Sequence, residues 1–261
     1  MNSSAHIIVL LALIVTGSAS DKPSAESIIQ RSETANEIDW KANPQYDWTE
    51  RDLQSNGSYK TLQEFMILGS PYGKLIAINN ASLSAEKARE EQQKMEAEIS
   101  KRQSETSEQR QKRVADFEKE RSREHAMLSQ LTQAFDFKLI GEKRFDSHDV
   151  YLLQATPKRG YHPPSMECQA LTGMQGRLWI DKKTFQWVKV EAEVVHPVSI
   201  EGILARVEPG TRFELEKIPV EGTVWLPKHY SMRSNAKVLF MVSHKGLDDE
   251  TYSNYHRSKN Y

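Results

Sequence analysis

The sequence predicts an α+β protein built on a wide antiparallel sheet. The strongest indication is the stretch GRLWIDKKTFQWVKVEAEVV at residues 176–195, which is rich in aromatic and β-branched residues, lacks proline and is interrupted once at residues 181–184. Its second arm alternates Val or Ala with Lys or Glu, which predicts a hairpin with one apolar face that other elements must cover. The register stays open: an even loop places Leu178 beside Trp187, and a bulged odd loop places it beside Val188.

Further strand signals occur on both sides of this hairpin. An amphipathic helix capped by Ser24 is expected to end before Pro44, and alternating residues then lead to Asn56-Gly57, a strong hairpin signal. We therefore divide the mature chain into an N-terminal helix and strand meander at 21–82 and further antiparallel strands of the same barrel at 133–246. A polar tail is expected at 247–261.

The segment between these two groups of strands has a different composition. Residues 84–125 contain neither Gly nor Pro, and acidic and basic residues are interleaved at helical spacing, so we predict a charged helical insertion at 83–132. Whether it forms one rod or folds back near residues 104–107 stays open. Its few apolar residues do not sustain a heptad seam, so we expect its ion pairs to be exposed and to contribute little to stability.

The N-terminus resembles an export signal. An apolar run at residues 7–15, too short to cross a bilayer, is followed directly by small residues at 17–20, and the composition changes abruptly at Asp21. We predict a signal peptide at 1–20 and a soluble, periplasmic mature protein. Cys168 is the only cysteine, which excludes an intramolecular disulfide and a Cys-based metal site.

Composition and motifs exclude several functional classes. The chain has 261 residues and a formal net charge of −1, so it has no basic excess with which to hold nucleic acid. It contains no HExxH, GxSxG, Walker A or GxGxxG motif, and its histidines lack ligand spacing. We therefore expect no enzyme, no cofactor and no metal. Glu191 and Glu193, two apart on one strand face, would suit acid/base work but equally suit a solvent-facing strand, and a hydrolase using Glu191 or Asp181 has no motif behind it.

The G-x-LWID-x-x-T strand at residues 176–184, followed by a strand of alternating Val and charge, resembles the LolA-like, outer-membrane lipoprotein-sorting superfamily, which includes a periplasmic lipoprotein receptor and sigma-regulator sensors. The resemblance implies a half-open antiparallel β-barrel, a strongly curved sheet with helices across its concave face. It also implies an apolar cavity that holds acyl chains, with no catalytic residues. The long charged insertion departs from the carriers of this superfamily.

These observations predict a non-enzymatic periplasmic carrier or sensor that binds a lipid or acylated, lipoprotein-type ligand between sheet and helices, with peripheral membrane contact. The alternative is a structural or signalling envelope protein that binds a protein partner through the charged insertion. Large apolar side chains of the predicted strands are the candidate lining of the cavity: Trp48, Phe65, Trp179, Trp187, Phe213, Trp225 and Phe240.

Overall fold

The computed structural model describes residues 22–165, 167–200, 205–238 and 242–259. The predicted signal peptide and Phe240 lie outside the described residues. Among those that are described, no helix combines the length and the apolarity needed to cross a bilayer.

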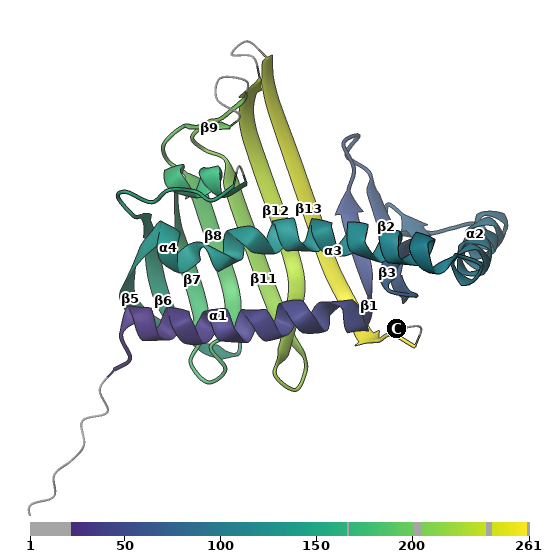
Figure 1. Ribbon diagram of the computed structural model, residues 1–261, viewed down its shortest axis with the longest axis horizontal. Helices are drawn as coiled ribbons and strands as arrows, with labels where there is room; N and C mark the ends of the chain where they lie inside the picture. Colours follow the sequence, from purple (N-terminus) through teal and green to yellow (C-terminus); the bar gives the residue numbers. More distant parts are fainter. Residues whose placement is uncertain (1–21, 166, 201–204, 239–241, 260–261) are drawn as a thin grey trace, which may run out of the picture.

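One antiparallel sheet forms the body of the protein (Figure 1). Its path runs β4-β3-β2-β1-β13-β12-β11-β8-β7-β6-β5, with the short β9 and β10 paired beside β12. The path is open because β4 and β5 are its two ends. The strands are β1 Tyr46–Leu53, β2 Tyr59–Ile67, β3 Ser70–Ile78, β4 Ala81–Ser82, β5 Phe135–Phe145, β6 His148–Pro157, β7 Met174–Asp181, β8 Trp187–Val194, β9 Val198–Ile200, β10 Ala205–Val207, β11 Arg212–Glu221, β12 Val224–Val238 and β13 Val242–Arg257.

Helices α1 and α3 cross one face of this sheet (Figure 1). The helices are α1 Ala25–Ala42, α2 Ala85–Gln103, α3 Ser107–Ser129 and α4 Leu131–Ala134, with 3-10 turns η1 Asn43–Gln45 and η2 Glu167–Gly173. The Ser24 hydroxyl accepts a hydrogen bond from the Ser27 N–H (3.2 Å), as the cap expected from the sequence requires. The predicted fold class, an open antiparallel sheet with helices across one face, is confirmed by the strand order and by the course of these helices.

The register of the central hairpin differs from both predicted alternatives. Leu178 lies opposite Val190, and the register shifts between Trp179 and Ile180. The turn is longer than the polar residues suggest, because Phe185 adopts a left-handed backbone conformation (φ 61°) and its ring is buried under the Arg31 guanidinium, 3.4 Å from the ring centroid. The register therefore follows from the hydrogen bonds that Asp181 accepts within the turn, together with the burial of Phe185 against α1.

The expected polar tail is also wrong for most of its length. Residues 247–257 belong to β13, which pairs with β12 on one side and with β1 on the other. A strand hydrogen-bonded on both edges can carry polar side chains, since its backbone groups are satisfied by its neighbours. The C-terminal strand thus joins the N-terminal meander to the rest of the sheet.

The charged insertion is neither one rod nor a helical hairpin. Helices α2 and α3 meet at an angle around residues 104–106, and this elbow sits on the β2–β3 turn (Figure 1). Thr106 begins α3 with a reciprocal capping box: its hydroxyl accepts from the Gln109 N–H (3.2 Å), and its own N–H donates to Gln109 Oε1 (2.9 Å).

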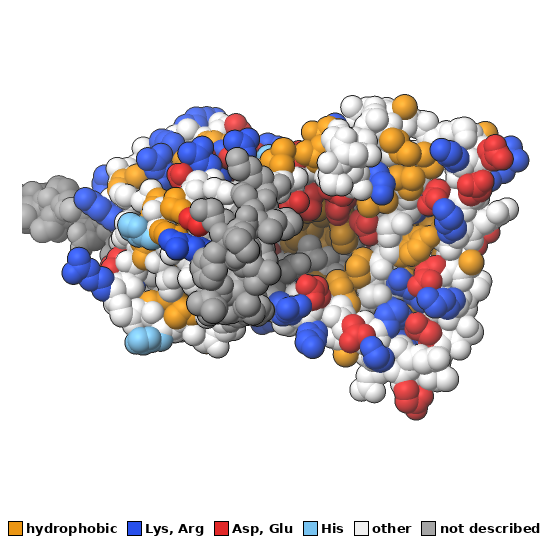
Figure 2. Space-filling model, turned by 90° about the horizontal axis from the view of Figure 1, so that it is seen from above, with side chains coloured by type: hydrophobic (Ala, Val, Ile, Leu, Met, Phe, Trp, Pro, Cys, Tyr) orange, Lys and Arg blue, Asp and Glu red, His pale blue; other side chains and the backbone are white. Residues whose placement is uncertain are grey.

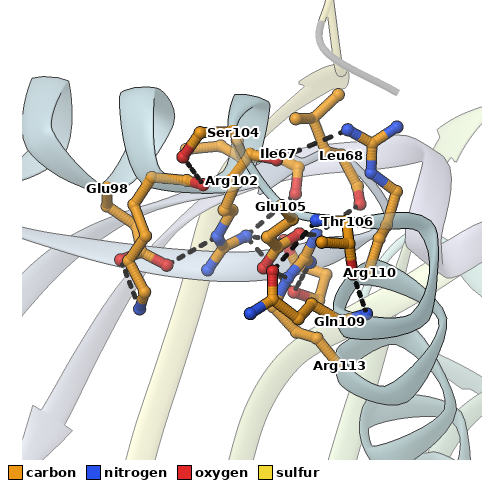
Figure 3. Close-up of polar contacts among 12 residues, drawn as sticks. Ile67, Leu68, Glu98, Arg102, Ser104, Glu105, Thr106, Gln109, Arg110 and Arg113 are labelled. Carbon is orange, nitrogen blue, oxygen red and sulfur yellow. Dashed lines mark hydrogen bonds and ion pairs between the residues drawn. The ribbon is translucent and has the colours of Figure 1, made fainter.

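Two arginines attach the elbow to the sheet (Figure 3). Arg102, only 5% exposed, donates to the carbonyl oxygens of Ile67 (2.8 Å), Ser70 (2.8 Å) and Pro71 (3.0 Å). Arg113 donates to the Leu68 carbonyl (3.1 Å). The expectation that this segment carries only exposed ion pairs is therefore wrong at these positions, because guanidinium groups satisfy the carbonyls of a tight turn.

Candidate functional site

The two ends of the helix-covered face have different surfaces, and one row of cross-strand neighbours shows the change. The row starts on β6 and runs across seven strands through Leu153, Leu178, Val190, Leu215, Tyr230, Glu250 and Asp52. Cross-strand neighbours project to the same face, so this face changes from aliphatic to acidic as it approaches β1. We call the two regions the apolar end (β5–β8) and the acidic end (β12, β13, β1 and β2).

The apolar end is filled by the chain itself. Ile28 and Ile29 of α1, at 0% and 2% exposure, pack with Leu153, Ile180 and other buried residues of this end. Cys168 of η2, fully buried, belongs to the same core. A ligand could not lie among these core side chains without displacing them.

A buried polar network fixes α1 to the sheet next to this core. The Lys217 ammonium pairs with Asp39 and donates to Asn36 Oδ1 (2.8 Å), and Gln186 Nε2 donates to Asp39 Oδ1 (2.9 Å). Burial raises the pKa of Asp39 in spite of the Lys217 charge, and burial lowers the pKa of Lys217. The sequence analysis did not identify this network, because its residues come from three separate segments and form no sequence motif.

The acidic end is hollowed rather than filled. Seen from above, the molecule has a hollow with acidic side chains along its wall and hydrophobic side chains inside (Figure 2). Four carboxyl groups lie on this part of the helix-covered face, where β1 pairs with β2 and β13: Glu50, Asp52, Glu64 and Glu250. Burial, followed by the charges of neighbouring acids, raises the pKa of Glu50 above its ordinary value. Burial also raises the pKa of Glu250.

Glu64 is the most deeply buried of these carboxyls. It is 9% exposed and lies opposite Trp48 on β1 and Gly73 on β3. One of its carboxylate oxygens lies 2.3 Å from where a Cβ at position 73 would be, so only glycine leaves room for this carboxyl to lie across the strand. Burial, and after it the negative charge of Glu50, raises the pKa of Glu64 to about 7.

Aromatic side chains stand among these acids. Trp48 Nε1 donates to Glu50 Oε2 (3.2 Å), and the Tyr252 hydroxyl donates to Glu250. Phe213 and Tyr230 meet edge to face with their centroids 5.5 Å apart. The acidic end therefore offers apolar ring surface beside unneutralised carboxyls.

The structure does not bring the predicted cavity residues together. Trp48 lies at the acidic end and Phe213 lies on β11 at its border, beside Tyr230 of β12, whereas Trp187 belongs to the core of the apolar end. Trp179 and Trp225 form a separate cluster with Val150 and Val188 on the opposite face, and Phe65 alternates with Glu64 and so also points to that face. The acids Glu50, Glu64 and Glu250 were missed, because each alone is typical of a solvent-facing strand position.

At the edge of the apolar end, a gap of about 290 Å³ lies between α1 and α3, with Trp187 and His125 in its lining. Beside it, Trp40 stacks on His125 with centroids 4.4 Å apart, and His125 Nε2 lies 2.8 Å from Glu37 Oε2. Trp187 Nε1 and His125 Nδ1 have no hydrogen-bond partner among the described residues. These contacts fasten the two helices to each other.

The opposite face carries a shallow, charged hollow of about 520 Å³. Its acids pair with neighbouring bases: Lys189 Nζ lies 3.0 Å from Glu191 and 2.7 Å from Glu214, and Arg212 lies 3.3 Å from Glu193. Asp181 forms its turn by accepting from the N–H groups of Lys183 (2.9 Å) and Thr184 (2.8 Å). Glu191 and Asp181 are thus engaged in structural contacts. Within the described ranges, no three His, Cys, Asp or Glu side chains are grouped so as to hold a metal ion.

No protein-family model matches the chain, and no curated protein matches its sequence. It is similar in structure to a LolA superfamily protein from Nitrosomonas europaea, with 12% identity, 92% of this chain and 96% of that chain covered, and a TM-score of 0.34. It is also similar to a putative outer membrane lipoprotein-sorting protein domain from Vibrio parahaemolyticus, with 10% identity, 91% of this chain and 94% of that chain covered, and a TM-score of 0.34. A DUF1329 family protein from Desulfovibrio piger has 10% identity, with 92% of this chain and 95% of that chain covered and a TM-score of 0.30. One of these proteins belongs to the superfamily that the motif at residues 176–193 resembles. Similarity at this level of identity gives no information about the ligand or the partner of this protein.

Proposed function

We propose that this protein is a non-enzymatic, exported periplasmic carrier or sensor that binds a lipid or acylated ligand at the acidic end of the helix-covered face. The observation that carries the proposal is the contrast between the two ends. The apolar end is filled by α1 and its own core, whereas the acidic end keeps a hollow with hydrophobic side chains inside it (Figure 2). A binding protein needs such a pre-formed concave surface.

The lining suits the apolar part of a ligand. Phe213, Tyr230 and Met232 are half-buried neighbours on β11 and β12, and the Met232 sulfur lies 3.7 Å from the Tyr230 hydroxyl. Covering apolar surface contributes about 2.5 kcal/mol per 100 Å², so an acyl chain lying along these residues would be held reversibly. Such a chain would enter without displacing the core of the apolar end.

The first test identifies what the protein carries and where. Native mass spectrometry after gentle purification should show co-purified lipid, and dodecanol should change the fluorescence of Trp48 on binding. Met232→Trp, which fills the hollow, should weaken dodecanol binding about tenfold or more, equivalent to about 1.4 kcal/mol. Ser231→Trp is the matched control, because residue 231 lies in the hollow on the opposite face. A wild-type protein that binds neither lipid nor dodecanol would refute the proposal.

A second candidate function is partner binding through α2 and α3, and the rigid attachment of the elbow favours it. Arg102 and Arg113 hold these helices in place, while ion pairs such as Lys112–Asp116, at 2.6 Å, stay on their outer surface. A fixed, charged helical surface suits a protein partner of the cell envelope. Reversing the charges of Lys112 and Asp116 together should then reduce partner binding and leave dodecanol binding unchanged.

A further inference from the structure

The carboxyls of the acidic end have no basic counterpart in the described part of the chain. No ion pair joins Glu50, Asp52, Glu64 or Glu250 to a described Lys, Arg or His, whereas the acids on the opposite face pair with Lys189 and Arg212. Acids that lie on one partly buried surface repel one another, and burial weakens the screening by water. A bound positive charge would relieve this repulsion.

The surroundings of Glu64 are a second, independent indication of a ligand site at the acidic end. The residue is only 9% exposed and its carboxyl has no hydrogen bond or ion pair to a described residue, yet its oxygens are not among the atoms shut off from solvent, so a ligand can reach them. Buried carboxyls normally have hydrogen-bond donors, because burial without them is unfavourable. Gly73 keeps the space that this carboxyl occupies, so the strand beneath it is adapted to its presence.

We infer that the ligand carries a cationic amine or ammonium group, which pairs with Glu64 and the neighbouring Glu50 at the acidic end. The inference rests on the proposed function, since the apolar part of the same ligand would lie along Phe213 and Met232. The ligand class is therefore an amphiphile with a positively charged head.

The surrounding side chains favour an organic cation over a metal ion. Trp48 lies opposite Glu64, and Tyr252 lies opposite Glu50, so an aromatic side chain neighbours each of these carboxyls. Aromatic rings attract ammonium groups and add to the ion pair. A divalent metal would instead need several oxygen ligands converging on one point, and the described residues contain no such group.

The test compares three ligands of one chain length at pH 7.5, below their micelle-forming concentrations: dodecylammonium, dodecanol and dodecanoate. The wild-type protein should bind dodecylammonium about tenfold or more tightly than the other two, because only this ligand can form a charge-assisted hydrogen bond with Glu64. Glu64→Gln should remove most of this preference, because it should weaken dodecylammonium binding far more than dodecanol binding. Gly73→Ala, which places a Cβ where the Glu64 carboxyl lies, should reduce the preference as well.

Glu193→Gln is the matched control, because it removes the same charge from the opposite face, where Glu193 pairs with Arg212. It should keep the full preference for dodecylammonium. Equal binding of dodecylammonium and dodecanol, or a preference that survives Glu64→Gln, would overturn the cationic ligand while leaving the proposed function intact. Failure of the wild-type protein to bind any of the three ligands would overturn both.

Discussion

The apolar end and the acidic end belong to one sheet, yet they are stabilised in different ways. At the apolar end, α1 packs Ile28 and Ile29 against the strands, so the sheet is stabilised by a hydrophobic core on its helix-covered face. At the acidic end, the elbow between α2 and α3 is fixed to the β2–β3 turn by Arg102 and Arg113. The attachment is made at the turn, and the acids Glu50 and Glu250 stay half-buried on the sheet surface where we place the proposed ligand.

The largest expected effect comes from tryptophans on the two ends. Trp187 is 4% exposed in the core of the apolar end. Trp187→Ala should lower the free energy of unfolding by about 3–5 kcal/mol. Trp48→Ala at the acidic end should cost roughly 1 kcal/mol, because this side chain is half-buried and lines a hollow. Urea unfolding of both variants measures the difference. Equal losses would mean that the acidic end is as tightly packed as the apolar end.

The buried pair that fastens α1 should give the next largest effect. Lys217→Met leaves the buried Asp39 carboxylate without its cation, which should cost about 3 kcal/mol at pH 7. The loss should be smaller near pH 4, because a protonated Asp39 carries no charge to neutralise. Urea titrations at both pH values measure it, with Lys228→Met, which removes a half-exposed surface ion pair to Glu216, as the control. A loss that does not change with pH would show that packing, and not charge, is what Lys217 provides.

Glu64 should make stability depend on pH at the acidic end. Its pKa is raised from 4.5 to about 7 in the folded protein, so the folded state binds the proton more tightly than the unfolded state does. Its contribution is therefore fully present below about pH 4.5 and is lost as the pH rises through 7, by up to about 3 kcal/mol. Glu64→Gln should remove this dependence and be the more stable protein at pH 8. A wild-type protein and Glu64→Gln with parallel pH profiles would show that Glu64 titrates normally.

Local sequence patterns predicted much of the fold, because the spacing of apolar residues identifies strands and helices, and capping residues identify helix ends. The alternation after Trp187 marks a strand, and Ser24 marks the start of α1, and both are found in the structure. The hairpin register was missed because the turn also includes Phe185, which is buried against Arg31, more than 150 residues away in sequence. Contacts over such separations leave no periodic trace.

The candidate site was missed for the same reason. Glu50, Glu64 and Glu250 come from three strands, two of them close in sequence and one near the C-terminus, and each alternates normally with its neighbours. Only the pairing of β13 with β1 brings them to one surface, and the composition of β13 favoured a tail. Likewise, the sequence does not distinguish the buried Arg102 from the exposed Lys101, since the carbonyls that Arg102 contacts lie on another element.

The smallest expected effect is the difference in stability between variants of the adjacent residues Arg102 and Lys101. Arg102→Ala should cost about 2 kcal/mol, because three turn carbonyls lose a charged donor and must be hydrated instead. Lys101→Ala should stay within about 0.5 kcal/mol of the wild type, because its ion pair with Glu98 is on the surface. Amide hydrogen exchange locates the change: Arg102→Ala should speed exchange in the β2–β3 turn and at the start of α3, and leave α1 protected. Faster exchange in α1 as well would show that the two ends of the sheet are not held independently, since loosening the elbow would then loosen the apolar core.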